Sequence, residues 1–217
     1  MPSPTIKGVI FDLDGTLLDT LGDLTTAVNL TAQDYALPQL TRDQVSANVG
    51  SGLLVTITKS LPQLDAAELP NALTCFKKHY ANCYLEGSQA YPGIVELLSE
   101  LQKRNIHCAI VSNKLHDYVV KLVDARFPDF HFDLIYGESA TQSRKPDPQG
   151  LLMACQVMGL SPDEVIMIGD SDADYISAQR INMRMLGVSW GFNTVEKLRS
   201  AGVKSFIYTA QELLEAL

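Results

Sequence analysis

The sequence lacks the features that mark several large classes of protein. None of its 217 residues lie in a run of about 18 consecutive apolar residues, and the opening MPSPTIKG has no long apolar segment of the kind a signal peptide carries. We therefore expect a soluble, cytoplasmic protein without a membrane span. There are 25 acidic residues against 17 basic ones, giving a net charge of −8, and the basic residues form no cluster. This pattern excludes a general nucleic-acid binder, although one locally positive site could still bind an anionic substrate.

The cysteines and histidines also lack the spacing of metal or redox sites. The four cysteines contain no CxxC pair and lie in apolar periodic segments, which predicts free, buried thiols: Cys75, Cys83, Cys108 and Cys155. The histidines are scattered without ligand spacing, so we assign them no chemistry.

Short, β-rich apolar runs alternate with segments of helical period. The runs cover residues 8–12, 107–112, 134–136, 165–169, 185–188 and 205–208. Near-continuous hydrophobicity is typical of strands that are covered on both faces, as in parallel sheets. The alternation predicts an α/β fold with a doubly wound, Rossmann-like parallel sheet.

One interval of the chain breaks this alternation. Residues 20–88 contain amphipathic helical patterns and no convincing strand, and the block is too long for a loop. We predict an α/β core formed by residues 1–19 and 89–217, with residues 20–88 inserted as an all-helical cap subdomain whose two ends lie beside the first strand.

Carboxylates follow the first predicted strand. Asp12 and Asp14 are two residues apart on an extended chain, so they face the same way. They stand at the carboxyl end of a parallel strand, where open α/β sheets bind their ligands. Gly15 permits a sharp exit from the strand. Taken alone, the pair is equally well explained as a solvated acidic turn.

Further polar residues follow later strands. Ser112 and Asn113 end the second long strand and offer a hydroxyl and backbone N–H groups to an anion. Lys145 precedes a helical segment, and Asp170 and Asp174 follow the strand at 165–169, one helical turn apart. In isolation these residues are explained as a helix N-cap, a loop lysine and a capped helix start.

Taken together, these elements resemble the haloacid dehalogenase-like phosphatases. The resemblance extends from about Lys7 to Val188 and is most specific in Phe11-Asp-Leu-Asp-Gly-Thr-Leu-Leu-Asp-Thr20. The helical insertion resembles the mobile cap of that family. Within the family, Asn48-Val-Gly-Ser-Gly52 and Arg144-Lys-Pro-Asp-Pro148 look most like the phosphoglycolate phosphatases.

The resemblance implies a phosphomonoester hydrolase that works through an aspartyl-phosphate. Asp12 would be the nucleophile, and Asp14 would protonate the leaving alcohol and later activate water. Ser112, the Asn113 backbone N–H and Lys145 would hold the transferring phosphoryl group.

The resemblance also implies a Mg²⁺ cofactor, because an anionic nucleophile is repelled by a phosphate dianion. Asp12 and Asp170 would supply carboxylates to the metal, and Asp14 its backbone carbonyl. Asp174 would orient Lys145 or a metal-bound water from outside the ligand set.

The cap segment Gly50-Ser51-Gly52 is a candidate for substrate specificity. Two glycines around a serine expose backbone N–H groups and allow a small anionic group such as a carboxylate to approach. Without the family resemblance, a plain turn between helices would be the preferred explanation of this segment.

Several functions remain open at the level of sequence. The partner is predicted to be a small phosphorylated metabolite, with phosphoglycolate the best single candidate and pyrophosphate, sugar phosphates and nucleoside monophosphates as alternatives. A phosphosugar mutase of the same superfamily is disfavoured, since its relatives carry a cap histidine where this chain has Leu24. A dehalogenase is disfavoured by the presence of Asp14. A catalytically silent binding protein would be expected to have lost motif residues. The sequence predicts no oligomeric state.

Overall fold

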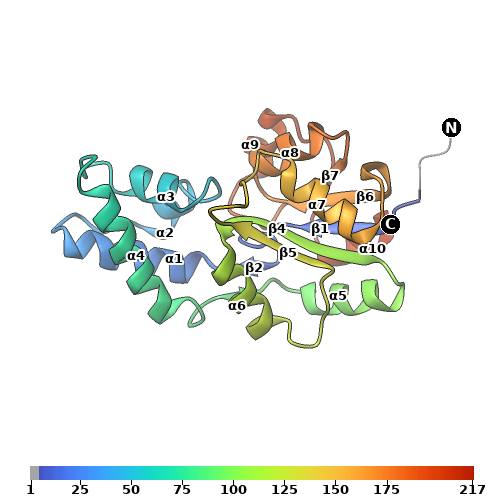
Figure 1. Ribbon diagram of the computed structural model, residues 1–217, viewed down its shortest axis with the longest axis horizontal. Helices are drawn as coiled ribbons and strands as arrows, with labels where there is room; N and C mark the ends of the chain where they lie inside the picture. The colour runs from blue at the N-terminus through green and yellow to red at the C-terminus, as the bar shows by residue number, and fades with distance from the viewer. Residues whose placement is uncertain (1–4) are drawn as a thin grey trace.

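A computed structural model describes residues 5–217 of the chain and contains a parallel sheet at the centre of an α/β core (Figure 1). Its six strands follow the order β5-β4-β1-β6-β7-β8. The strands are β1 (Gly8–Phe11), β4 (His107–Leu115), β5 (Leu134–Glu138), β6 (Val165–Gly169), β7 (Arg184–Val188) and β8 (Phe206–Ile207). All five pairings between them are parallel, so the predicted α/β fold is confirmed.

Helices cover both faces of this sheet, which explains why its strands are apolar throughout. On one face pack α5 (Ile94–Lys103), α6 (His116–Arg126) and α10 (Ala210–Ala216). On the other lie α7 (Gln149–Met158), α8 (Asp172–Gln179) and α9 (Val195–Ala201), with a short 3₁₀ turn, η1 (Pro162–Glu164), before β6. Each face has its own buried hydrophobic cluster, as a doubly wound sheet requires.

The register of the central strands brings the ends of three of them together. β1 lies between β4 and β6, and Phe11 is level with Ile110 on one side and Ile168 on the other. The residues that follow these three positions therefore meet at one edge of the sheet. β4 is longer than the sequence predicts and continues past Ser112 with an irregular register before its last residue, Leu115, pairs with Glu138.

The cap helices have a hydrophobic core of their own. They are α1 (Leu21–Asp34), α2 (Arg42–Ser46), α3 (Leu53–Ser60) and α4 (Leu69–Cys83), and they lie together at one end of the molecule (Figure 1). Two short strands, β2 (Leu18–Asp19) before the first cap helix and β3 (Gln89–Ala90) after the last, pair with each other in antiparallel orientation. We propose residues 20–88 as the cap, since this pairing closes just outside those limits.

A buried carboxylate fastens the exit of the cap to its first helix. Asp23 in α1 is 4% exposed and accepts hydrogen bonds from the backbone N–H of Gly87 at 2.7 Å and of Ser88 at 2.8 Å. The Ser88 hydroxyl donates a third at 2.6 Å. These bonds join residues more than sixty positions apart, so the sequence pattern alone does not reveal them.

Replacing Asp23 by alanine should destabilise the protein by about 2–3 kcal/mol, because buried N–H groups would lose their acceptor. The free energy of unfolding from urea denaturation measures this effect. Asp34→Ala is the matched control: Asp34 is exposed and pairs with His79 at 2.7 Å, so its loss should cost less than about 1 kcal/mol. Equal losses in both variants would contradict the structural role of Asp23.

The structure also describes the cysteines, the backbone at Asn182 and the character of the helices. The four cysteines are free thiols, but Cys75 is only half-buried, because it lies at the edge of the apolar face of α4. Asn182 adopts a left-handed conformation with φ of 54°, at the turn that follows α8. Within residues 5–217, no helix combines the length and the apolar character that crossing a bilayer requires.

Candidate active site

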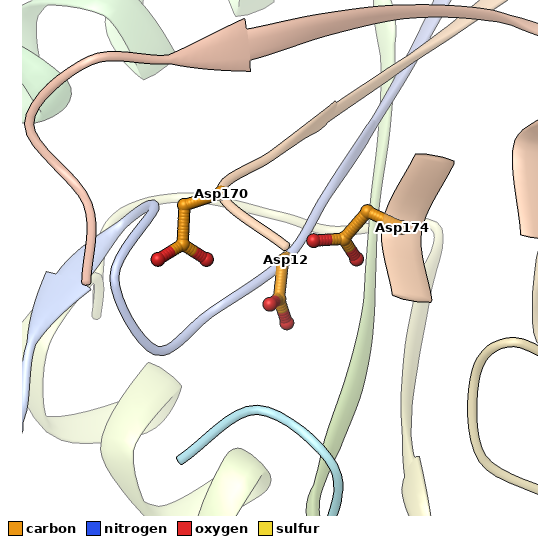
Figure 2. Close-up of side chains that lie close together, drawn as sticks. All are labelled: Asp12, Asp170 and Asp174. Atoms are coloured by element: carbon orange, nitrogen blue, oxygen red, sulfur yellow. The ribbon is translucent and has the colours of Figure 1, made fainter. Parts of the chain in front are cut away.

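Three buried carboxylates converge at the carboxyl edge of the sheet (Figure 2). Asp12 follows β1, Asp170 follows β6, and Asp174 lies in the first turn of α8. Each residue contributes one carboxylate oxygen, and these three oxygens all lie within 4.8 Å of one another. The structure therefore brings together Asp12 and Asp170, the two predicted metal carboxylates, and adds Asp174 to the same cluster.

Local structure fixes the two carboxylates that come from the β6–α8 connection. Ser171 caps α8, and the Oδ2 atom of Asp174 accepts a hydrogen bond from the Ser171 backbone N–H at 3.0 Å in a capping box. Asp170 accepts one from the backbone N–H of Phe192 at 2.6 Å. Gly15 has a φ of +81°, and a side chain there would collide with Asp170, so only glycine fits this turn.

Lys145 neutralises part of this negative charge. Its ammonium lies 3.0 Å from Asp12 and 2.5 Å from Asp174, and it donates a hydrogen bond to the Val111 carbonyl at 2.6 Å. The side chain is 1% exposed. Lys145 therefore lies among the acidic residues and contacts both Asp12 and Asp174, while its predicted role toward a phosphoryl group stays a prediction.

Burial shapes the proton affinity of the cluster. It raises the pKa of Asp12 to about 6, against the lowering effect of the Lys145 ammonium. Burial, followed by the charges of Asp12 and Asp174, raises the pKa of Asp170 well above its usual value. The pKa of Lys145 rises because the charges of these carboxylates outweigh its desolvation. The cluster contains three carboxylates and one ammonium group. Because the carboxylates outnumber the ammonium, the cluster is suited to binding a further cation.

Ser112 and Asn113 lie beside this cluster, but the Asn113 side chain has a structural use that the sequence did not predict. Its amide nitrogen donates to the carbonyls of Gly50 and Lys145, both at 2.9 Å, and its oxygen accepts from the Lys145 backbone N–H at 2.7 Å. Asn113 therefore links the end of β4 to the Lys145 loop and to the cap. Ser112 is 2% exposed, and its hydroxyl accepts a hydrogen bond from the Lys114 N–H at 3.3 Å.

The Asp14 carboxylate lines the same cavity as Asp12 but is not part of the acidic cluster. It accepts a hydrogen bond from the Thr20 hydroxyl at 2.6 Å and forms an ion pair with the Lys114 ammonium at 3.0 Å. Sequence reasoning missed Lys114, although its place directly after Ser112 and Asn113 at a strand end was a usable signal.

A cavity between the cap and the core joins these residues. Its lining includes Asp12, Asp14, Ser112, Asn113 and Lys114 from the core and Leu24, Val49, Gly50, Gly52, Leu53, Thr56, Phe76 and Tyr80 from the cap, with Leu115 and Tyr118. Of the segment predicted to determine specificity, Gly50 and Gly52 line the cavity and Ser51 is not among the lining residues.

Gly52→Ala should lower kcat/KM at least about tenfold, because it disturbs the contact between cap and core. Gly52 has a φ of +90°, and an added Cβ would lie 2.7 Å from Arg144 and 2.9 Å from Glu138. Gly159→Ala is the control, since Gly159 also has a positive φ, +68°, but no neighbour within 4 Å of the added atom. Steady-state kinetics with a chromogenic phosphate ester measures both. Similar losses in the two variants would mean that backbone strain alone explains the effect.

Comparison with known proteins agrees with this geometry. The family model of the haloacid dehalogenase-like hydrolases matches residues 9–188. A phosphoglycolate phosphatase of Thiobacillus denitrificans is 33% identical over 87% of this chain and 85% of its own length, and one of Colwellia psychrerythraea is 31% identical over 96% of both. The crystal structure of a Lactobacillus delbrueckii protein superposes with a TM-score of 0.93 at 31% identity and covers 98% of both chains.

The chain therefore belongs to the haloacid dehalogenase-like hydrolases. The sequence prediction of this family is confirmed, as is that of a phosphatase. Several proteins to which it is similar are named phosphoglycolate phosphatases. Phosphatases of this family generally use Mg²⁺, and the buried acidic cluster has the oxygen donors that this ion prefers.

Proposed function

We propose that this protein is a Mg²⁺-dependent hydrolase of 2-phosphoglycolate that acts through an aspartyl-phosphate on Asp12. The observation that carries the proposal is the position of Asp12. It belongs to the acidic cluster, contacts Lys145, and also lines the cavity between cap and core. The names of the similar proteins support the choice of substrate.

The acidic cluster fits a magnesium ion. The ion prefers oxygen ligands and usually takes one or two protein carboxylates together with water and phosphate oxygens. Asp12 and Asp170 would supply the carboxylates and Asp14 its backbone carbonyl, while Asp174 stays engaged with Ser171 and Lys145. The bound ion would offset the repulsion between the Asp12 carboxylate and the phosphate dianion.

In the proposed reaction, Asp12 is the nucleophile, Asp14 is the general acid and base, and other side chains bind the phosphoryl group. One oxygen of Asp12 attacks phosphorus and the ester P–O bond breaks, while Asp14, protonated at the start of this step, gives its proton to the departing alkoxide and becomes a carboxylate. Asp14 next takes a proton from water, whose oxygen attacks phosphorus and releases phosphate and the Asp12 carboxylate. Lys145, Ser112 and the Asn113 backbone N–H would bind the phosphoryl oxygens in both steps.

The contacts of Asp12 favour its role as nucleophile. Its Oδ1 atom accepts a hydrogen bond from the Leu13 N–H at 2.7 Å and lies 3.0 Å from the Lys145 ammonium. Within residues 5–217 no such contact is made by Oδ2. One oxygen is thus held while the other remains available for attack.

The cavity argues against the phosphosugar mutase. The position at which mutases of this superfamily carry a cap histidine is Leu24 here, and Leu24 lines the cavity as a buried aliphatic side chain. A hydrocarbon cannot exchange protons with a sugar hydroxyl. The cavity therefore favours hydrolysis.

The test is hydrolysis of a panel of phosphate esters with and without Mg²⁺. We expect phosphate release that depends on Mg²⁺, with the highest kcat/KM for 2-phosphoglycolate among 2-phosphoglycolate, glucose 6-phosphate, pyrophosphate and a nucleoside monophosphate. Faster turnover of any other member would reject the substrate. Full activity in EDTA would reject the metal.

A further inference from the structure

Lys114 is a buried cation on the wall of the cavity that the reaction scheme leaves unused. Its side chain is 6% exposed, and its ammonium lies 3.0 Å from Asp14 and 4.8 Å from the centre of the Tyr80 ring. An ammonium in this position is desolvated on the protein side, and it depends on Asp14 and on the aromatic face for stabilisation. Its one ionic partner among the described residues is Asp14, so it can also take a hydrogen bond to a second, bound anion.

The surroundings of Lys114 contain little else that could bind a polar leaving group. Among the described residues that line the cavity, Lys114 is the only basic one. The cap side of the wall is largely apolar and includes Leu24, Val49, Leu53 and Phe76. A leaving group with several hydroxyls would leave them unpaired against this wall, which is costly.

Tyr80 adds a second unused polar group beside Lys114. The side chain is 2% exposed, and its hydroxyl has no hydrogen-bond partner within the part of the chain that the structure describes. It belongs to α4 of the cap, whereas Lys114 belongs to β4 of the core. A ligand that contacted both would join the cap to the core.

We propose that Lys114, assisted by Tyr80, binds the carboxylate of the leaving group, so that the preferred substrates are phosphate esters of short 2-hydroxy acids. This inference rests on the proposed function, in which Asp14 protonates the ester oxygen. That oxygen must then lie beside the Asp14 carboxylate, which is 3.0 Å from the Lys114 ammonium. A carboxylate on the carbon that carries the ester oxygen would then come close to the ammonium, because both would lie beside Asp14.

The test compares two substrates that differ in the carboxylate alone, 2-phosphoglycolate and ethyl phosphate. Lys114→Met keeps the length of the side chain and removes its charge. We expect the ratio of kcat/KM for 2-phosphoglycolate to that for ethyl phosphate to fall about 30- to 100-fold, the range for loss of a charged hydrogen bond. Lys121→Met is the control, since Lys121 lies over Tyr118 at 5.5 Å from its ring centre but is exposed and does not line the cavity.

Each outcome bears on the proposal. Equal loss on both substrates would show that Lys114 acts only through Asp14 and would overturn the proposal, as would an unchanged ratio. If the unmodified protein hydrolyses ethyl phosphate but not 2-phosphoglycolate, the proposed substrate fails and the carboxylate site with it. Lys114→Gln, which should lower the ratio in the same way, replaces the methionine variant if circular dichroism shows that the latter is unfolded.

Discussion

Asp12→Asn is expected to lower kcat by about 10⁴-fold or more, while the protein stays folded. An amide is a poor nucleophile and a weaker ligand for Mg²⁺, so one substitution removes two contributions to the same step. Asparagine has nearly the shape of aspartate, and its oxygen can still accept the hydrogen bond from the Leu13 N–H. The measurement is phosphate release at saturating Mg²⁺, with the unfolding transition recorded by circular dichroism.

A second readout tests the covalent intermediate directly. Acid quenching of the unmodified protein during turnover of a ³²P-labelled ester should leave label on the peptide that contains Asp12, and the variant should carry none. Asp129→Asn serves as the control, because Asp129 is an exposed residue of the loop after α6 and should keep both label and turnover. Turnover by Asp12→Asn near the unmodified rate would show that the proposed mechanism is wrong.

The sheet and the positions of its strands were predictable because each strand is buried on both faces. Burial on both faces gives an apolar run such as Val165–Gly169, which stands out from the amphipathic helices around it. The extension of β4 beyond Ser112 was missed, since the polar residues Asn113 and Lys114 end the apolar run and the register there is irregular. The two-residue strands β2 and β3 are too short to produce a sequence pattern at all.

The acidic cluster was predictable for a topological reason. Parallel strands place their carboxyl ends at one edge, so residues that directly follow β1, β4 and β6 lie close together whatever their separation in sequence. What topology does not specify is the direction of each side chain. Asp12 and Asp14 both line the cavity, but Asp12 belongs to the acidic cluster and Asp14 pairs with Lys114. β1 ends at Phe11, so neither aspartate lies within the regular strand whose alternation the prediction assumed.

Contacts between the cap and the core were the least predictable part of the site. The hydrogen bond from Asn113 to Gly50 joins residues 63 positions apart, and the approach of Lys114 to Tyr80 depends on how the cap lies over the sheet. Neither leaves a periodic or local signal. The left-handed conformation of Asn182, by contrast, follows from residue type, because asparagine adopts it more readily than any residue except glycine.

Asp170→Asn is expected to raise the stability of the metal-free protein and to weaken its activation by Mg²⁺. Burial, with the charges of Asp12 and Asp174, raises the pKa of Asp170, so its ionised form destabilises the folded protein. Below the ordinary pKa of an aspartate the residue is protonated in both the folded and unfolded states, and the variant gains nothing. As the pH rises from the ordinary pKa of an aspartate to the raised pKa of Asp170, the unmodified protein loses stability relative to the variant. Above the raised pKa, the difference in free energy of unfolding between the two proteins is constant. In EDTA at neutral or higher pH we expect the variant to be more stable by about 1–3 kcal/mol.

Magnesium should reverse this order. The unmodified protein gains stability from a bound ion in proportion to its occupancy, whereas Asp170→Asn has lost a carboxylate ligand and should gain little at the same concentration. The Mg²⁺ concentration for half-maximal activity should rise at least about 100-fold in the variant. Melting temperatures with EDTA and across a Mg²⁺ titration measure both effects, with the exposed neighbour Asp172→Asn as the control that should behave like the unmodified protein. An equal rise in melting temperature with Mg²⁺ in all three proteins would mean that the ion binds elsewhere, because the cluster of Asp12, Asp170 and Asp174 could not then account for the stabilisation.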